Sequence, residues 1–179
     1  MVRTESRRRM KCLSVLALLI GLWLPLLAGC QTEAPDHEPV TPEPRDVREP
    51  TSDERESMFR AASRGNDEEL RHLLEDGIDP NTTDDEGFIA LHAAARFGHV
   101  ESAVLLLEKG AAINHQSNNG NTPLHWAARA GQYNMAEFLL DAGADPNLRN
   151  EVGGTPMRFA LNNNYRQIVE LLIARGGTE

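Results

Sequence analysis

The sequence predicts an all-α solenoid, and three observations support this fold class. One pattern of residues returns every 33 positions from about residue 51 to residue 179. A period of about 20 to 50 residues is typical of solenoids, in which each structural unit packs on its neighbours. Pairs of alanines and pairs of leucines recur in the same register, as expected for a shared core. Glycines of the kind that end helices recur at Gly77, Gly110, Gly143 and Gly176.

The clearest copy of the pattern begins at Asn119 with N-G-N-T-P-L-H-W-A-A-R-A-G and continues with F-L-L-D-A-G-A-D-P-N up to Asn147. This pattern resembles the ankyrin repeat, whose period has the same length. The resemblance implies a short β-turn loop and two antiparallel helices in each repeat. The four repeats occupy residues 51–83, 84–116, 117–149 and 150–179, which together cover about 129 of the 179 residues.

Both end repeats depart from the pattern, as capping repeats of solenoids do. The first repeat lacks T-P-L-H, but Thr51 and Glu54 have the spacing of a capping box. In the last repeat Asn164 replaces the helix-ending Gly131, and asparagine is the next-best residue for a left-handed turn. That repeat is polar over residues 162–167, which predicts a C-terminal cap. The register predicts a core of paired alanines together with Leu91, Leu106, Leu107, Leu124, Leu139, Leu140 and Leu172.

One helix start in the array is expected to be weak. The second repeat has Ile89-Ala90 where the third has Thr122-Pro123. A threonine caps a helix by accepting a backbone N–H, and proline suits the first helical position. Ile89 has no side-chain oxygen, so we expect this helix to begin without a side-chain cap. The loss of such a cap costs about 0.5–2 kcal/mol.

The N-terminus resembles the signal peptide of a bacterial lipoprotein. Residues 1–11 are basic and residues 12–27 are nearly all apolar, a run shorter than the roughly 20 residues of a membrane-spanning helix. Leu27-Ala28-Gly29-Cys30 then matches the lipobox. The resemblance implies cleavage after residue 29 and acylation of Cys30, for example with palmitate, which would anchor the protein in a membrane. A plain signal anchor with an incidental cysteine is the alternative.

The residues around the lipobox bear on the localisation of the protein and on its distance from the membrane. Gln31 stands where an inner-membrane retention aspartate could stand, so the resemblance implies the outer membrane, with the protein facing the periplasm. The arginines before the apolar run weakly resemble a twin-arginine export signal, but the favoured interpretation is the ordinary basic region of a signal peptide. Residues 30–50 alternate prolines with acids, which predicts a disordered tether. Extended as polyproline II, this tether would reach about 60 Å.

The charge balance argues against nucleic acid as a partner. The formal net charge is −9, and residues 1–29 contribute +4, so the remaining chain carries −13. Binding to nucleic acid depends on lysines and arginines that meet phosphates. The only cysteines, Cys12 and Cys30, lie outside the repeats. We therefore expect no disulfide and no thiolate chemistry in the repeat domain, residues 51–179.

No pattern in the repeats indicates catalysis, a cofactor or a metal site. His92 and His125 occupy equivalent positions, where the family resemblance implies bonds to backbone and to the capping threonine. Neighbouring helices lie about 8–10 Å apart, too far for two such nitrogens to share one zinc ion. The acidic residues 82–86 lack the spacing of a calcium loop, so a solvated turn is favoured. We expect a protein that is not an enzyme.

A protein is the expected partner. The resemblance implies binding by the turn tips and by the exposed concave face of the first helices. The corresponding positions of this chain are Arg64, Phe88, Arg96, Phe97, Asn121, Arg129, Asn162 and Asn163. We expect Arg64, Arg96 and Arg129 to form a row flanked by the two phenylalanines, because arginines and aromatic residues are enriched in binding hot spots. Alternatively, the arginines pair with nearby acids and the phenylalanines pack inside the stack.

Together these features predict a monomeric, membrane-anchored module that binds one protein partner stoichiometrically in the bacterial envelope. The resemblance implies roles such as an immunity protein against a toxin or a helper of an envelope enzyme, and the fold alone does not choose between them. A structural tether without one tight partner is the alternative, and an enzyme is less favoured. Trp126, which Ala93 and Phe159 replace in neighbouring copies, is assigned to packing.

Overall fold

The computed structural model describes residues 49–179, so the predicted signal peptide, Cys30 and most of the predicted tether lie outside the described residues. Within this range the chain forms eight helices in four successive pairs. The pairs are α1 (Ser52–Arg64) with α2 (Asp67–Glu75), α3 (Ala90–Phe97) with α4 (Val100–Glu108), α5 (Pro123–Ala130) with α6 (Tyr133–Asp141), and α7 (Pro156–Asn162) with α8 (Arg166–Ala174). None of these eight helices is long and apolar enough to cross a membrane.

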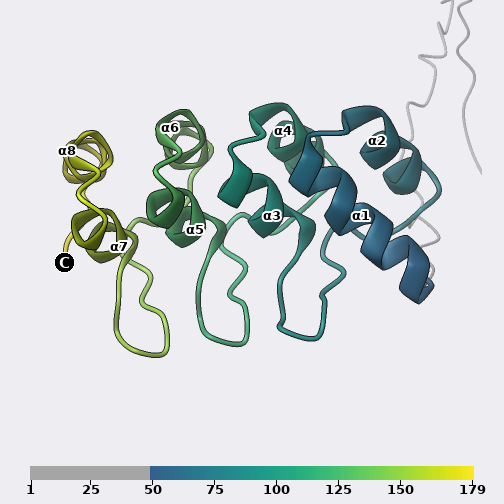
Figure 1. Cartoon of the computed structure of the whole chain (residues 1–179), viewed down its shortest axis with the longest axis horizontal. Helices are drawn as coiled ribbons and strands as arrows, with labels where there is room; N and C mark the ends of the chain where they lie inside the picture. The colour runs from purple at the N-terminus through teal and green to yellow at the C-terminus, as the bar shows by residue number, and fades with distance from the viewer. Residues whose placement is uncertain (1–48) are drawn as a thin grey trace, which may run out of the picture. The chain divides into compact units, whose positions relative to one another are not determined.

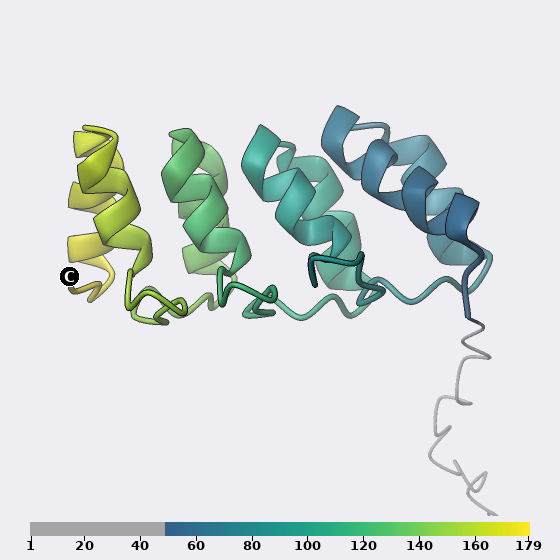
Figure 2. The same ribbon diagram turned by 60° about the horizontal axis from the view of Figure 1, so that its bottom comes forward.

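The helix pairs stack in chain order. The first helices α1, α3, α5 and α7 stand side by side in one row, and the second helices form another row beside them (Figure 1). The connections from one pair to the next project together beyond the ends of the helices (Figures 1 and 2). This arrangement confirms the predicted all-α solenoid of four helix–turn–helix repeats.

Threonines begin the first helices of repeats one, three and four. Thr51 Oγ1 accepts the N–H of Glu54 at 3.3 Å, and the Thr51 N–H donates to the Glu54 carboxylate at 2.9 Å, which confirms the predicted capping box. Thr122 and Thr155 also accept the backbone N–H three residues on, and each precedes a proline in the first turn. These bonds fix where each first helix starts.

Helix α3 begins without a side-chain cap, as the sequence predicts. Its N-cap residue is Ile89, whose side chain is fully buried. His92 compensates in part, because its Nδ1 accepts the Ile89 N–H at 3.1 Å. The second repeat therefore lacks a cap bond of about 0.5–2 kcal/mol but buries aliphatic surface at the same position.

The first helices end at a residue in the left-handed conformation. The φ angle is 68° at Gly65, 80° at Gly98 and 75° at Gly131. Asn164 keeps this conformation in the fourth repeat, with a φ of 60°, as predicted. Gly131 is constrained for a second reason, since a Cβ there would lie 2.7 Å from the ring of Tyr165 in the next repeat.

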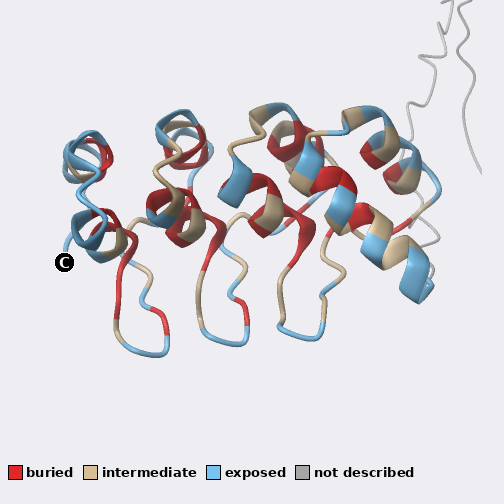
Figure 3. Cartoon of the chain, in the orientation of Figure 1, coloured by how far each residue is buried: buried red, intermediate tan, exposed pale blue. Residues whose placement is uncertain are grey.

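The core follows the predicted register. Most of the predicted leucines are buried, and Leu107 is partly buried. The alanine pairs Ala61-Ala62, Ala94-Ala95 and Ala127-Ala128 are fully buried. Small side chains at these positions let consecutive first helices approach closely. In Figure 3 buried segments recur on the helices of successive repeats.

The C-terminal cap is less polar than the sequence suggested. The polar residues 162–167 lie in the connection between α7 and α8 and at the start of α8. Leu161 is 40% exposed, whereas Ala128 at the equivalent position of the third repeat is fully buried. Ile173 is 60% exposed, whereas the equivalent Leu140 is 9% exposed. The last repeat therefore presents apolar side chains at positions that a following repeat covers elsewhere in the array.

Recurring asparagines join successive repeats. Asn81 Oδ1 accepts the N–H of Ala112 at 2.7 Å, and Asn147 Oδ1 accepts the N–H of Thr178 at 2.8 Å. Each bond crosses from one repeat to the next. The return of asparagine at the same position of the first three repeats thus has a physical cause, because its amide satisfies backbone groups that no helix pairs.

Candidate protein-binding surface

Two guanidinium groups lie over the indole ring of Trp126, which projects from α5. The Cζ of Arg96, near the end of α3, is 5.3 Å from the ring centroid, and the Cζ of Arg129 is 5.1 Å from it. The Arg96 Cζ also lies 5.4 Å from the ring centroid of Phe97. Each cation–π contact of this kind contributes about 0.5–1 kcal/mol at an exposed site. Both arginines are exposed, so these contacts hold positive charge at the surface.

Phe88 completes the aromatic cluster from the turn before α3. Its ring meets Trp126 edge-on, with 5.5 Å between centroids, and meets His92 edge-on at 5.3 Å. The turn is held by Asp84, whose carboxylate accepts the backbone N–H groups of Glu86 and Phe88 at 2.9 Å each. Phe88 is therefore placed by the hydrogen bonds of its own turn.

These side chains surround a hollow of about 260 Å³, called here the aromatic hollow. It forms because Ala93 is small at a position where the third and fourth repeats carry Trp126 and Phe159. Phe97 stands at its rim with 49% of its surface exposed. The lining residues are Phe59, Asp84, Glu86, Phe88, His92, Ala93, Arg96, Phe97 and Trp126.

A second hollow adjoins the first. It has a volume of about 290 Å³ and is called here the arginine hollow. Its lining residues are Arg96, Trp126, Arg129 and Ala130. Because Arg96 and Trp126 line both hollows, an apolar recess and a positively charged recess lie next to each other on the first helices.

The two arginines of this surface have no carboxylate partner within the part of the chain that the structure describes. Among residues 49–179, neither Arg96 nor Arg129 lies within ion-pair distance of an acid. The ion pairs found in this range are Arg60–Glu56 and Arg175–Asp141. The alternative that these arginines pair with neighbouring acids is not seen for Arg96 and Arg129 within residues 49–179. Stacking, rather than ion pairing, holds them in place.

Family models of ankyrin repeats match most of this helical array. One model, of three copies, matches residues 58–150, and another, of many copies, matches residues 135–173. The chain belongs to the ankyrin-repeat family. No curated protein matches it. Ankyrin repeats indicate a protein–protein interaction module, and ankyrin-repeat proteins are typically not enzymes.

Half of the residues predicted to contact a partner line the two hollows of this ankyrin stack. Phe88, Arg96 and Phe97 line the aromatic hollow, and Arg96 and Arg129 line the arginine hollow. They come from consecutive repeats and from positions that the family resemblance singles out. The geometry thus groups these four residues into one surface.

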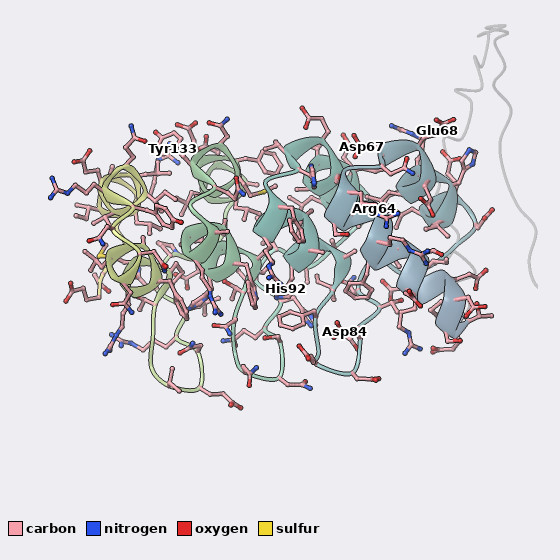
Figure 4. All side chains as sticks on the ribbon, in the orientation of Figure 1. Arg64, Asp67, Glu68, Asp84, His92 and Tyr133 are labelled. Carbon is pink, nitrogen blue, oxygen red and sulfur yellow. The ribbon has the colours of Figure 1, made fainter. Side chains whose placement is uncertain are left out.

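Arg64 does not continue the row of arginines, contrary to the expectation from the sequence. It directly precedes the left-handed glycine of its helix, as Phe97 does, whereas Arg96 stands one residue earlier. One residue turns a helical side chain by about 100°. In Figure 4 Arg64 lies toward the second helices, whereas Asp84 and His92 lie toward the projecting connections. Arg64 is exposed but lines neither hollow.

The three predicted asparagines also lie outside the hollows. Asn121 is half-buried, and its Oδ1 accepts the Nδ2–H of Asn150 at 2.9 Å. Its side chain therefore joins two repeats instead of facing a partner. Asn162 and Asn163 are exposed, but they belong to the last repeat.

Trp126, which the sequence interpretation assigned to packing, does pack against Phe88 and also lies at the centre of this surface. Its ring is half-buried and lines both hollows. The sequence does contain a signal for this role. A tryptophan follows an alanine at the same register position, so part of its ring has no large neighbour in the preceding repeat.

The histidines that recur in the repeat pattern, His92 and His125, form hydrogen bonds inside the stack. His125 Nδ1 accepts the Thr122 N–H at 3.1 Å, and its Nε2 lies 3.0 Å from the carbonyl oxygen of Gly154. His92 Nε2 lies 3.0 Å from the carbonyl oxygen of Asn121. Because Nδ1 accepts a backbone N–H in both cases, Nε2 carries the proton and donates to the next repeat. The predicted structural role is confirmed, and no group of three potential ligand side chains within residues 49–179 could hold a metal ion.

Burial keeps these histidines neutral. Desolvation lowers the pKa of His92 from 6.5 to about 4, and desolvation also lowers the pKa of His125. Protonation would place a hydrogen on Nδ1, which would then lose its acceptor role at the helix start. Folding and neutral imidazole are therefore linked in this ankyrin stack.

We expect stability to fall in mild acid for this reason. The unfolded chain binds a proton at His92 below pH 6.5, whereas the folded chain binds it only near pH 4, so this contribution is complete above pH 6.5 and is lost as the pH falls toward 4. Between pH 7 and pH 5 the free energy of unfolding should drop by about 2 kcal/mol more in the wild type than in His92→Gln. Urea unfolding at the two pH values measures both drops. Equal drops would show that His92 is not held neutral.

Proposed function

We propose that this ankyrin-repeat protein binds one protein partner stoichiometrically through the aromatic hollow and the arginine hollow, while a lipid on Cys30 holds it at the bacterial envelope. The gathering of Phe88, Arg96, Phe97 and Arg129 around Trp126 carries the first part of this proposal. Tryptophan and arginine are enriched among residues that dominate binding energies.

The state of these side chains supports a binding role. Phe97 leaves half of its surface in water, although apolar contact would bury it. Arg96 and Arg129 have no acid within ion-pair distance in the described part of the chain. Cation–π contacts restrict both guanidinium groups, which lowers the conformational cost of binding. A fitted partner would therefore gain apolar burial and charge pairing at side chains that are already positioned.

The proposed anchor rests on the N-terminal sequence. The lipobox Leu27-Ala28-Gly29-Cys30 follows an apolar run, and the acidic, proline-rich residues after it suit a spacer. Acyl chains hold a protein through about 0.8 kcal/mol for each buried CH₂ group. We place the module at the outer membrane, facing the periplasm. Neutralising a toxin and assisting an envelope enzyme both require the same stoichiometric contact.

Partner capture should depend on the hollows. An affinity-tagged full-length protein that replaces the wild type in its native host can be cross-linked and purified with what it binds. The double variant Arg96→Glu/Phe97→Ala should recover the partner about tenfold less well than the wild type, because it reverses one charge and removes the rim ring. The wild type should hold the partner at near one-to-one stoichiometry.

A matched control makes this comparison specific. Arg71 and Ile173 are exposed residues that line neither hollow, so Arg71→Glu/Ile173→Ala makes the same charge reversal and also truncates an exposed apolar side chain elsewhere. This control should capture the partner as the wild type does, with circular dichroism confirming that both variants fold. Undiminished capture by the Arg96/Phe97 variant would refute the proposed surface.

Membrane attachment should depend on one cysteine. Cells fed with labelled palmitate should label the wild type and Cys12→Ser, because Cys12 lies within the predicted signal peptide. Cys30→Ser should lose the label and should no longer be cleaved after residue 29. If the Cys30→Ser variant were still labelled with palmitate or still cleaved after residue 29, the lipobox assignment would be wrong. The alternative of a plain signal anchor would then be favoured.

A further inference from the structure

We infer that the two adjoining hollows recognise one short element of the partner: a bulky apolar side chain that enters the aromatic hollow, next to a carboxylate that binds Arg96 and Arg129 in the arginine hollow. This inference rests on the proposed function, because it names the chemistry of the partner at the same surface. The occupant is a protein segment that carries an aromatic or large aliphatic residue beside an aspartate or glutamate.

The size and lining of the aromatic hollow suit one apolar side chain. Its volume is about 260 Å³, below the roughly 300–1,000 Å³ of pockets that enclose whole small-molecule ligands. Rings of Phe59, Phe88, Phe97 and Trp126 surround it, and Ala93 leaves the space between them. Aromatic rings favour offset or edge-on contact with another ring. A single inserted side chain would cover the exposed part of Phe97.

The arginine hollow suits a carboxylate. A guanidinium group presents a planar set of N–H donors that matches the two oxygens of a carboxylate. The guanidinium carbons of Arg96 and Arg129 lie 5.3 Å and 5.1 Å from the ring centroid of Trp126. Neither arginine forms an ion pair with an acid of the described chain. Two positioned cations at one recess attract a single anion strongly in a protein that is otherwise acidic.

The indole N–H of Trp126 gives an independent indication of a missing acceptor. Within the described residues, Trp126 Nε1 is buried and has no hydrogen-bond partner. A buried donor without an acceptor costs about 1–3 kcal/mol. Trp126 lines the arginine hollow, so a carboxylate bound there would bring an acceptor to the ring that carries this N–H. The same anion would then satisfy three donors on three side chains.

A cationic side chain fits the surface less well. Asp84 and Glu86 line the aromatic hollow and would attract a lysine. However, the Asp84 carboxylate already accepts two backbone N–H groups. Arg96 lies over Phe97 and Trp126, the rings on which a second cation would stack, and its charge opposes that cation. The observed contacts therefore favour an anion beside the apolar side chain.

The element is recognised at one place in the array. In the next repeat, the positions of Arg129 and Trp126 are taken by Asn162 and Phe159, so that the positive charge is absent there. The first repeat has Ser63 at the position of Arg96. Only the junction of the second and third repeats combines both halves of the site among the described residues.

Defined peptides test this specificity without the natural partner. In the protein expressed at full length and kept in detergent micelles, Trp23→Phe leaves Trp126 as the only tryptophan, whether or not residues 1–29 are removed, so that Trp126 is the fluorescent reporter. The probe is acetyl-Gly-Ser-Phe-Asp-Ser-Gly-amide, compared with peptides in which alanine replaces the phenylalanine, or asparagine or lysine replaces the aspartate. We expect the probe to bind about tenfold more tightly than each of the other three.

Protein variants assign the two halves of the site. Arg129→Gln should abolish the preference for aspartate over asparagine and keep the preference for phenylalanine over alanine. The control Arg71→Gln, on α2, should change neither. The inference is overturned if the lysine peptide binds as tightly as the probe, or if no peptide changes the fluorescence at millimolar concentration. If no peptide binds while partner capture still depends on Arg96 and Phe97, the proposed function is supported and the inferred peptide specificity is rejected.

Discussion

The contact between consecutive repeats is the constraint on which the rest of this structure depends. Alanine pairs such as Ala94-Ala95 bring neighbouring first helices close together, and His92 donates across the junction to the carbonyl oxygen of Asn121. These contacts fix the register of one repeat on the next. Residues at equivalent positions therefore line up across the array, which is how side chains from α3 and α5 come to share one surface.

Regular contacts also make the irregular positions informative. The leucines and the loop asparagines that return with the period serve the stack. The candidate surface combines one recurring pair, Arg96 and Arg129, with positions that change between repeats: Ala93 stands before Trp126, and Phe97 stands before Ala130. A small residue followed by a large one at the same position opens a hollow that uniform repeats would fill. The proposed binding surface thus arises from differences between neighbouring repeats that share a common core.

Periodicity made most of the fold predictable, and the errors have local causes. The capping box at Thr51, the uncapped start at Ile89 and the left-handed Asn164 followed from single residues with strong backbone preferences. The hollows beside Trp126 were not predicted, because they depend on the size of Ala93 in the preceding repeat. Arg64 was placed in a row with Arg96 although it stands one position out of register, where a helix points a side chain elsewhere.

The central claim is that a protein partner sits on the hollows at the junction of the second and third repeats. Site-specific photocrosslinking in living cells tests it most directly. A photoreactive phenylalanine analogue in place of Phe97 should yield one strong adduct with a protein, because Phe97 stands at the rim of the aromatic hollow. The same analogue in place of Ile173, which is somewhat more exposed than Phe97 but lies in α8, should yield none. An adduct from position 173 and none from position 97 would contradict the account.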